Sequence, residues 1–292
     1  MDIYLSTIKF SFKKTEKINF DYNISKLYGK QIIDFKDNFY CYYYCVDTLV
    51  LPTSIPDFVG RSFDDTQIPY EWKIFKADNE IFIHIDFFEN ESIKEVSTVL
   101  NFLEKKIVVE IVPHSINSPI TIDPFFHPLG SLIMVYLSRY SGGFLVHASG
   151  INDKTNGYLF SGVSGVGKST ISQLWSEQGA TIINDDRIWV QKIDNQWKMF
   201  NTPMVSYRQE PLMATLSKIF LISHSHENFI TKISNAHGAL GVMSNCIQHL
   251  FDKKTTASHL DTIFELSESI PIYKLGFKPT SEVVGLIRDI SE

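Results

Sequence analysis

The residues with the clearest potential for chemistry form one short run, Gly162-Val-Ser-Gly-Val-Gly-Lys-Ser169. It matches the pattern G-x-x-x-x-G-K-S of phosphate-binding loops. Such a loop turns its backbone N–H groups toward a phosphate, which requires backbone conformations that the three glycines of the run tolerate best. Lys168 would place its positive charge on the β- and γ-phosphates, and Ser169 would offer its hydroxyl to Mg²⁺.

The sequence around the run predicts the elements that a phosphate-binding loop needs. The apolar stretch Tyr158-Leu-Phe160 favours a strand before it, and a helix is expected over Lys168–Gln178, with its positive end toward the bound anion. We therefore expect ATP and Mg²⁺ as cofactors, although the motif does not contact the base and leaves GTP open. The residues expected to bind the nucleotide are Gly162, Ser164, Gly165, Val166, Gly167, Lys168, Ser169 and Thr170.

Two adjacent carboxylates, Asp185 and Asp186, follow the short apolar stretch Thr181-Ile-Ile183. Asp185 comes 185 − 168 = 17 residues after Lys168, about the length of one helix, a turn and a strand. At the carboxyl end of a strand the pair can face the phosphate loop, where carboxylates can bind Mg²⁺ and accept a proton from a hydroxyl. A solvated turn is the alternative interpretation, since Asp-Asp is common in loops.

His147 is the third candidate for the same site. It lies in a strand expected over Phe144–Ser149, directly before the strand that leads into the loop. A lone histidine is more often structural than catalytic. Here its ring can hydrogen-bond one of the two aspartates and change the basicity of that carboxylate.

Three segments, Leu145–Gly150, Gly157–Thr170 and Ala180–Arg187, carry these residues. Together they resemble the catalytic domain of the HPr kinase/phosphorylase family. The sequence is more similar still to the HPr-kinase-like relatives found beside peptide-modification genes, including lasso-peptide kinases. The resemblance is strong over about residues 120–190. It continues more weakly through Asn201–Pro203, Lys218–Leu221 and Ile272–Pro279.

The resemblance implies a phosphoenolpyruvate-carboxykinase-like nucleotide-binding fold and transfer of phosphate to a serine hydroxyl. By position, Asp185 resembles the general base that takes the proton of the acceptor, and His147 resembles the histidine that supports this base. Ser169 and Asp186 resemble the metal-side residues. Asp185, His147 and Lys168 are thus the expected catalytic residues. The motif fixes the aspartate pair better than the role of each member, so base and metal ligand stay open between the two.

Two departures from the family pattern concern the acceptor. The bifunctional HPr enzymes usually have Ser-Glu after the loop lysine, whereas this chain has Ser169-Thr170. They also carry a later Glu-Ile-Arg-Gly-type motif, to which the nearest charged group here is Arg208-Gln-Glu210. Both departures weaken HPr as the substrate and phosphorolysis as an activity. They favour the peptide or small-molecule kinases of the wider group.

The chain changes in character where Ser, Asn and Pro cluster, around Pro113–Pro124. Before this break, stretches such as Ile3–Phe12 are dense in β-branched and aromatic residues, which favours strands. After it, strands and helices alternate, which favours an α/β layer architecture. We predict an α+β protein with a β-rich N-terminal domain over residues 1–120, for recognition or assembly. A phosphoenolpyruvate-carboxykinase-like P-loop catalytic domain is expected over residues 121–292.

Several elements are harder to assign from the sequence. Segment 92–112 is compatible with a helix followed by a strand or with a hairpin that turns near Glu104-Lys105, and the hairpin is slightly favoured. Apolar spacing predicts one helix over Asp123–Tyr140, with a bend at Pro128. A second helix is expected over Asn235–Phe251.

The composition argues against several classes of protein. Of the 292 residues, 27 are Lys or Arg and 33 are Asp or Glu, which gives a formal net charge of −6, and no basic run exceeds a pair, so a nucleic-acid partner is not expected. No stretch approaches the roughly 20 apolar residues of a membrane span. The odd count of three cysteines fits a reducing compartment, and the N-terminus lacks the pattern of a secretory signal, so a cytoplasmic location is expected.

These observations favour an ATP- and Mg²⁺-dependent kinase that phosphorylates a serine hydroxyl of a peptide or protein, in peptide natural-product modification. One alternative is a kinase of a small-molecule hydroxyl, which would have a closed pocket beside Asp185 where a peptide kinase would have an open groove. Another is a non-catalytic nucleotide-binding regulatory module, against which the presence of both Asp185 and His147 argues. The oligomeric state stays open, with a homo-oligomer among the alternatives.

Overall fold

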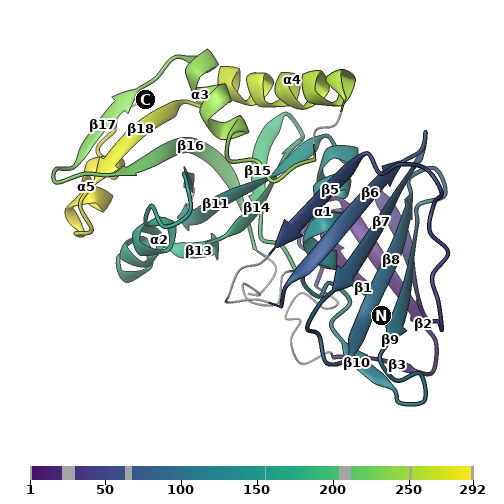
Figure 1. Ribbon diagram of the computed structural model, residues 1–292. Coiled ribbons are helices and arrows are strands. Elements are labelled where there is room, and N and C mark those ends of the chain that lie inside the picture. The colour runs from purple at the N-terminus through teal and green to yellow at the C-terminus, as the bar shows by residue number, and fades with distance from the viewer. Residues whose placement is uncertain are drawn as a thin grey trace. The chain divides into compact units, whose positions relative to one another are not determined.

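The first ten elements are strands, and from Leu129 onward helices and further strands follow, which confirms the predicted α+β class (Figure 1). The structure is a computed structural model that describes residues 2–21, 30–62, 68–154, 156–203, 212–249 and 252–290. The chain divides into two compact units, Met1–Ile133 and Met134–Glu292. This division falls within helix α1 (Leu129–Tyr140) rather than at residue 120. The assignment of recognition to one part and catalysis to the other stays a prediction.

The first unit is built on an eight-stranded sheet with the strand order β1-β2-β4-β9-β8-β7-β6-β5, next to a pair formed by β10 and β3. Strand β4 pairs in parallel with β2 on one side and with β9 on the other. The meander from β9 to β5 is antiparallel. The strands are β1 (Asp2–Leu5), β2 (Ile8–Lys14), β3 (Ile18–Phe20), β4 (Asp37–Cys45), β5 (Phe58–Ser62), β6 (Tyr70–Lys76), β7 (Glu80–Phe87), β8 (Ile93–Asn101), β9 (Lys106–Pro113) and β10 (Ile120–Ile122).

One face of this sheet carries the core, because alternate side chains of each strand point to the same side. On β4, for example, Phe39, Cys41 and Tyr43 are each 1% exposed or less. The ring of Phe125 packs edge-on against Phe12 from β2. The buried hydroxyl of Tyr43 donates a hydrogen bond of 2.5 Å to the carbonyl of Pro124, which ties the chain after β10 to the sheet.

Two predictions in the first unit are confirmed and one is corrected. The stretch Ile3–Phe12 forms strands, as predicted. The chain turns at Ser6, whose φ is +51°, so that β1 and β2 form a hairpin. Segment 92–112 is the hairpin β8–β9, as favoured from the sequence. The helix predicted over residues 123–140 begins only at Leu129, because the Asp123 carboxylate accepts a hydrogen bond from the Phe125 amide, which forms a turn, and Pro128 disfavours helical backbone before it.

The second unit contains a sheet in the order β12-β11-β14-β15-β16-β18-β17, with β13 paired to β11. Because β12 pairs with both β11 and β16, the strands β11, β14, β15, β16 and β12 form a closed ring of hydrogen-bonded neighbours. The strands are β11 (Gly143–Asp153), β12 (Asn156–Ser161), β13 (Thr181–Asn184), β14 (Arg187–Ile193), β15 (Gln196–Phe200), β16 (Met213–His224), β17 (Phe229–Lys232) and β18 (Ile272–Phe277).

Helices cover both faces of the part of this sheet that contains β12, β16 and β18 (Figure 1). On one face, side chains of α3 and α4 pack against the sheet, and on the other face side chains of α2 and α5 do so. Stacked rings of Phe160, Phe220 and Tyr273 join β12, β16 and β18 at one level. The helices are α2 (Lys168–Glu177), α3 (Asn235–Met243), α4 (Lys253–Ser269) and α5 (Glu282–Arg288).

The helix predicted over residues 235–251 is shorter in the structure, where α3 ends at Met243. After α3 the backbone turns and pairs with β11 instead. The His147 amide donates to the Asn245 carbonyl at 2.9 Å, and the Ile247 amide donates to the Leu145 carbonyl at 2.8 Å. The hydrogen bonds of this segment to β11 thus replace those of a longer helix.

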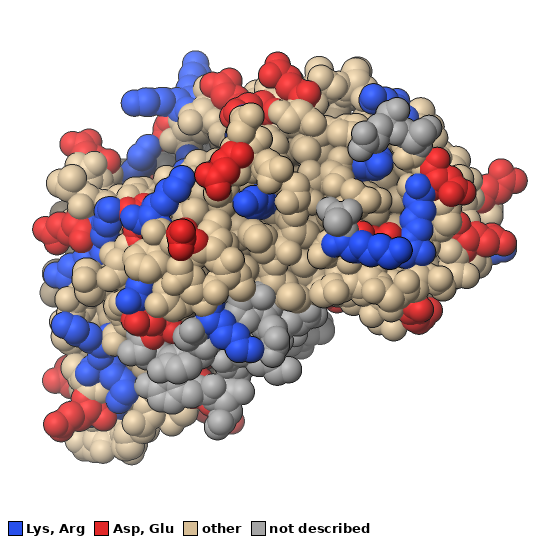
Figure 2. Space-filling view, turned by 180° about the vertical axis from the view of Figure 1, so that it is seen from behind, with Lys and Arg blue, Asp and Glu red and all other residues tan. Residues whose placement is uncertain are grey.

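Over the face seen in Figure 2, Lys and Arg are interspersed with Asp and Glu, and neither sign gathers into one large patch. Within the described ranges, none of the helices has the length and apolar character needed to cross a membrane.

Two buried histidines in the second unit predict a loss of stability in acid. Burial, and next the charge of Arg139, lower the pKa of His249 and of His259 to about 4. The ordinary pKa is 6.5, so below that pH the unfolded chain binds protons that the folded protein does not. The free energy of unfolding should therefore decrease between about pH 6.5 and about pH 4, by up to about 3 kcal/mol for each histidine.

Urea denaturation at a series of pH values would measure this decrease. The variant His259→Leu removes one of the two groups while keeping an apolar side chain against Phe144, and its stability should depend less steeply on pH. An identical pH dependence in the variant and the original protein would show that His259 does not contribute.

Candidate functional site

Strand β11 holds the central residue of the site, His147, at the point where its pairing changes. The first half of β11, up to His147, pairs with β14, and the second half, from Ala148, pairs with β12. In that register Ala148 lies opposite Ser161, the last residue of β12. The Ser161 hydroxyl also donates a hydrogen bond to the His147 carbonyl at 3.2 Å. His147 is therefore fixed beside the start of the glycine-rich loop.

The glycine-rich loop connects β12 to α2, which confirms the predicted order of strand, loop and helix. Two of its glycines have positive φ, +77° at Gly165 and +101° at Gly167. Gly162 does not, which corrects the sequence interpretation. Its role is steric, because a Cβ atom there would lie 3.0 Å from Val166 Cγ1 and 3.1 Å from the Ile222 carbonyl oxygen.

The start of α2 leaves backbone N–H groups without acceptors in the protein. Gly167 occupies the N-cap position with a left-handed backbone, and no side chain caps the helix. Among the described residues, the amides of Gly167, Lys168 and Ser169 have no hydrogen-bond acceptor. The loop and the helix N-terminus together thus offer several donors to an anion, which fits a phosphate group.

The side chain of Lys168 folds onto the loop that precedes it. This side chain is buried, and its ammonium group donates hydrogen bonds to the carbonyls of Gly162 and Val163, each at 3.1 Å. Burial lowers the pKa of this ammonium group, and the charge of Asp186 opposes that shift. Lys168 and Asp186 therefore interact electrostatically, which links the loop to the predicted aspartate pair.

The aspartate pair forms the turn between β13 and β14. The buried side chain of Asn184 holds this turn, because its Oδ1 accepts hydrogen bonds from the amides of Asp186 at 2.9 Å and Arg187 at 3.1 Å. The Asp186 carbonyl accepts a hydrogen bond from the Ala148 amide at 3.0 Å. The turn is thus attached to β11 one residue after His147. Sequence reasoning did not single out Asn184, although Asn at the end of a strand before a turn is a known signal for such a bond.

The carboxylate of Asp186 is held from two sides. His147 Nε2 lies 3.2 Å from its Oδ1, and Arg187 Nε lies 3.1 Å from its Oδ2. Burial by itself would raise the pKa of Asp186. The hydrogen bond with His147, together with the charges of Arg187, His147 and Lys168, outweighs burial, so that the pKa of Asp186 lies below its ordinary value. Asp186 is therefore a stable anion and a weak proton acceptor.

Asp185 differs from its neighbour. Its side chain is half-buried, and within the described part of the chain it makes neither a hydrogen bond nor an ion pair. The resemblance had paired His147 with Asp185. In the structure, the partner of His147 is Asp186 instead. The reason lies in the turn, since the bond between Ala148 and Asp186 sets Asp186 beside β11.

The remaining candidates lie at the helix start. Ser164, Ser169 and Thr170 are exposed, and Val166 is buried, where its side chain packs beneath the loop. The Ser169 hydroxyl and the Asp186 carboxylate are oxygen ligands of the type that Mg²⁺ prefers. The residues present thus fit a bound nucleotide and Mg²⁺ in chemistry, and their roles stay predictions.

One contact to the loop was not expected. His224, at the end of β16, lies with its Nε2 3.2 Å from the Gly165 carbonyl oxygen. Sequence reasoning did not place His224 in this site. The contact follows from the parallel pairing of β16 with β12, which brings the end of β16 beside the loop. The local sequence does not indicate this pairing. Arg208-Gln-Glu210, the nearest charged group to the missing family motif, lies outside the described residues.

Comparison with known proteins adds little to this geometry. No protein-family model and no curated protein matches the chain. Among solved structures, the chain is similar to the Hpr(Ser) kinase/phosphatase from Coxiella burnetii, with a TM-score of 0.30 and 12% sequence identity. The match covers 49% of this chain and 90% of the other. A likeness at this level carries no argument about fold or function, so the interpretation of the site rests on its own residues.

The loop geometry predicts the effect of adding a side chain at Gly167. A Cβ atom there would lie 2.8 Å from Phe277 Cζ, on a backbone with φ of +101°. Gly167→Ala should lower the free energy of unfolding by about 1–2 kcal/mol for the backbone conformation alone, and should also shift the amides that face the anion. Urea denaturation and calorimetric titration with ATP would measure both effects.

Gly165→Ala is the matched control, because Gly165 also has positive φ but has open space where a Cβ atom would lie. It should cost less stability than Gly167→Ala. Equal losses in the two variants would show that the contact with Phe277 is of no importance.

Proposed function

We propose that the chain is an ATP- and Mg²⁺-dependent kinase that transfers the γ-phosphoryl group to a serine hydroxyl of a peptide or protein, in peptide natural-product modification. One observation carries this proposal. Lys168 lies at the start of α2, where no side chain caps the helix, and its ammonium group interacts electrostatically with the carboxylate of Asp186. The resemblance of the three sequence segments to HPr-kinase-like serine kinases supports the choice of acceptor.

Within this proposal the loop binds and orients the phosphates. The amides at the start of α2 donate to phosphate oxygens, and the ammonium group of Lys168 exchanges its two carbonyl contacts for phosphate oxygens. Ser169 and Asp186 hold the metal ion, for which a carboxylate with a low pKa is suited because it stays ionised. Bound Mg²⁺ supplies charge neutralisation on the phosphates.

Asp185 is the residue left to act on the acceptor. It takes the proton of the serine hydroxyl, whose oxygen bonds to the γ-phosphorus while the bond from that phosphorus to the bridging oxygen breaks and ADP leaves. Asp185 has no polar partner among the described residues, which supports this role, whereas His147 and Arg187 contact Asp186. His147 is then a positioning residue that orients Asp186. We propose that the first unit provides the recognition or assembly surface.

The loop lysine gives the first test. Lys168→Ala should abolish ATP binding, because it removes the one side-chain charge that the loop places on the phosphates. Isothermal titration calorimetry with ATP and Mg²⁺ would measure this, with Lys254→Ala, an exposed lysine of α4, as the control for the loss of one charge. Tight binding retained by Lys168→Ala would exclude the loop as the nucleotide site.

The aspartate pair gives the second test. Asp185→Asn should bind ATP as the original protein does and lose phosphoryl transfer by about 10²-fold or more, the usual contribution of a general base. Asp186→Asn should instead weaken the Mg²⁺ dependence of ATP binding. Transfer can be followed by mass spectrometry of serine-containing peptides incubated with ATP and Mg²⁺.

Unchanged turnover in Asp185→Asn would assign the base to another group. Phosphorylation of small hydroxyl compounds without any peptide product would favour the small-molecule kinase. ATP binding without transfer to either class of acceptor would favour the non-catalytic regulatory module.

A further inference from the structure

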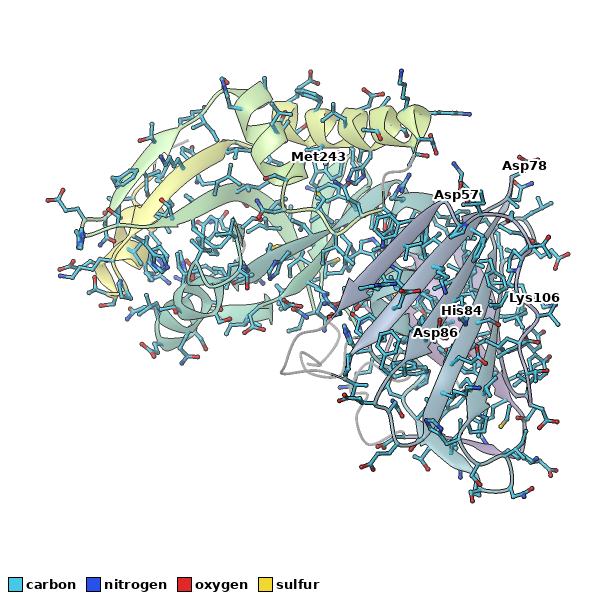
Figure 3. The ribbon with its side chains drawn as sticks, in the orientation of Figure 1. Asp57, Asp78, His84, Asp86, Lys106 and Met243 are labelled. Atoms are coloured by element: carbon cyan, nitrogen blue, oxygen red, sulfur yellow. The ribbon has the colours of Figure 1, made fainter. Side chains whose placement is uncertain are left out.

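A second group of chemically active side chains lies in the first unit, on β7 and β8, and is not used by the proposed kinase site. His84 and Asp86 come from β7 (Figure 3), and Glu95 comes from β8. Because side chains alternate along a strand, His84 and Asp86 point away from the side of Ile83 and Ile85, which face the core. His84 is nevertheless only 2% exposed.

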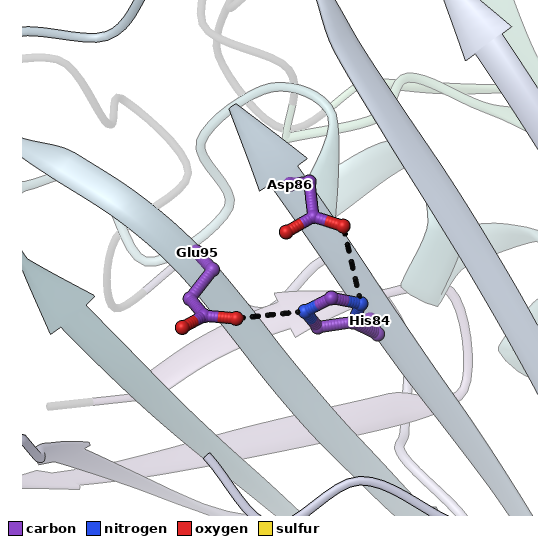
Figure 4. Close-up of side chains that lie close together, drawn as sticks. All are labelled: His84, Asp86 and Glu95. Carbon is purple, nitrogen blue, oxygen red and sulfur yellow. Dashed lines mark hydrogen bonds and ion pairs between the residues drawn. The ribbon is translucent and has the colours of Figure 1, made fainter. Parts of the chain in front are cut away.

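The imidazole ring of His84 lies between the two carboxylates (Figure 4). Its Nε2 is 3.1 Å from Glu95 Oε2, a hydrogen-bond distance. Its Nδ1 is 3.6 Å from Asp86 Oδ2, which is too long for a hydrogen bond. In the part of the chain that the structure describes, this buried Nδ1 has no hydrogen-bond partner.

A neutral histidine cannot satisfy this arrangement. If Nε2 carries the proton and donates it to Glu95, the lone pair of Nδ1 faces the negative charge of Asp86. If Nδ1 carries the proton, the lone pair of Nε2 faces Glu95 instead. In addition, Asp86 and Glu95 lie directly opposite one another in the register of β7 and β8, where like charges repel. A cation between these groups would remove both conflicts.

The distances favour a metal ion over a second proton as this cation. An imidazolium N–H would pull a carboxylate oxygen to about 2.7–2.9 Å. Two ligand atoms that share one tetrahedral ion at about 2.1 Å each lie about 3.4 Å apart, close to the separation of Nδ1 and Asp86 Oδ2. One ligand atom from each of His84, Asp86 and Glu95 lies within 4.8 Å of the others.

The charges around the cluster also favour a cation. Glu71 of β6 lies opposite Asp86 of β7. Glu110 of β9 lies opposite Ser97 of β8 and accepts a hydrogen bond of 3.3 Å from the Ser97 hydroxyl. The two nearby basic side chains, Lys73 and Arg61, both contact Glu71.

Lys73 also competes for Asp86. Its Nζ is 3.5 Å from Asp86 Oδ2 and 3.1 Å from Glu71 Oε1. The shorter contact to Glu71 means that Lys73 keeps a carboxylate partner when Asp86 binds another cation. Asp86 is also partly exposed, which gives an ion a path from solvent.

We propose that His84, Asp86 and Glu95 form a binding site for a Zn²⁺-class transition-metal ion. His84 Nδ1 and the Asp86 carboxylate are the ligands, and Glu95 accepts the proton of Nε2 and so fixes the tautomer that presents Nδ1. The nitrogen ligand selects against Mg²⁺, which prefers oxygen, so this site is distinct in chemistry from the proposed kinase site. Its occupation does not depend on nucleotide binding.

Zinc titration of the full chain tests the site. Zn²⁺ binding, measured by competition with a chromophoric chelator, should be at least tenfold weaker in Asp86→Asn, and Mg²⁺ in excess should not displace the ion. Glu95→Gln should weaken binding less, because its amide oxygen still accepts the proton of Nε2. The control His226→Asn, which removes an exposed histidine, should bind Zn²⁺ as the original protein does.

Nitrogen-15 NMR of the His84 ring identifies the cation independently of the variants. The Nδ1 resonance should shift on addition of Zn²⁺ while Nε2 stays protonated. A ring that carries protons on both nitrogens and does not respond to excess Zn²⁺ would identify the proton as the bridging cation and overturn the proposal. Equal Zn²⁺ affinity in Asp86→Asn and the original protein would also overturn it.

Discussion

The divided pairing of β11 is the constraint on which the candidate kinase site depends. Its backbone pairs with β14 up to His147 and with β12 and β13 after it, and the His147 amide donates a hydrogen bond to the Asn245 carbonyl. A one-residue slip of this strand would turn His147 to the opposite face and move it away from both the loop and Asp186. Main-chain hydrogen bonds of the sheet thus determine where the side chains of His147 and Asp186 lie.

The same strand explains why two neighbouring aspartates differ. The Ala148 amide binds the Asp186 carbonyl, so the turn is fixed at Asp186, whose carboxylate then meets His147 and Arg187. Asp185 lies one residue earlier, and its side chain is half-buried. Adjacent identical residues thus acquire different electrostatics: contacts with cationic partners lower the pKa of Asp186, whereas Asp185 has no such contacts among the described residues. This separation is the physical basis of our proposal that Asp186 binds the metal ion and Asp185 accepts the proton.

Local patterns in the sequence were sufficient for the loop and its flanking elements, because glycine, lysine and helix-start signals act within a few residues of one another. They were insufficient wherever a distant segment decided the outcome. Apolar spacing continued past Met243, but the backbone of the following residues forms hydrogen bonds with β11 instead of continuing the helix. The partner of His147 and the contact of His224 with Gly165 likewise depend on strand pairing across long separations, which no local pattern encodes.

The two histidine–carboxylate groups of this protein show that composition alone does not define a site. At His147 the contact with Asp186 has hydrogen-bond length, and Arg187 lies beside the second oxygen of that carboxylate, so each Asp186 oxygen has a partner. At His84 two carboxylates share one ring, and one of the two contacts is too long for a hydrogen bond. Of the nearby basic side chains, Arg61 contacts Glu71, and Lys73 contacts Glu71 more closely than Asp86. Within the described ranges, the second arrangement leaves the buried Nδ1 of His84 beside a carboxylate without a hydrogen-bond partner. We therefore propose a cation with nitrogen affinity for the second arrangement, and the oxygen chemistry of phosphate and Mg²⁺ for the first.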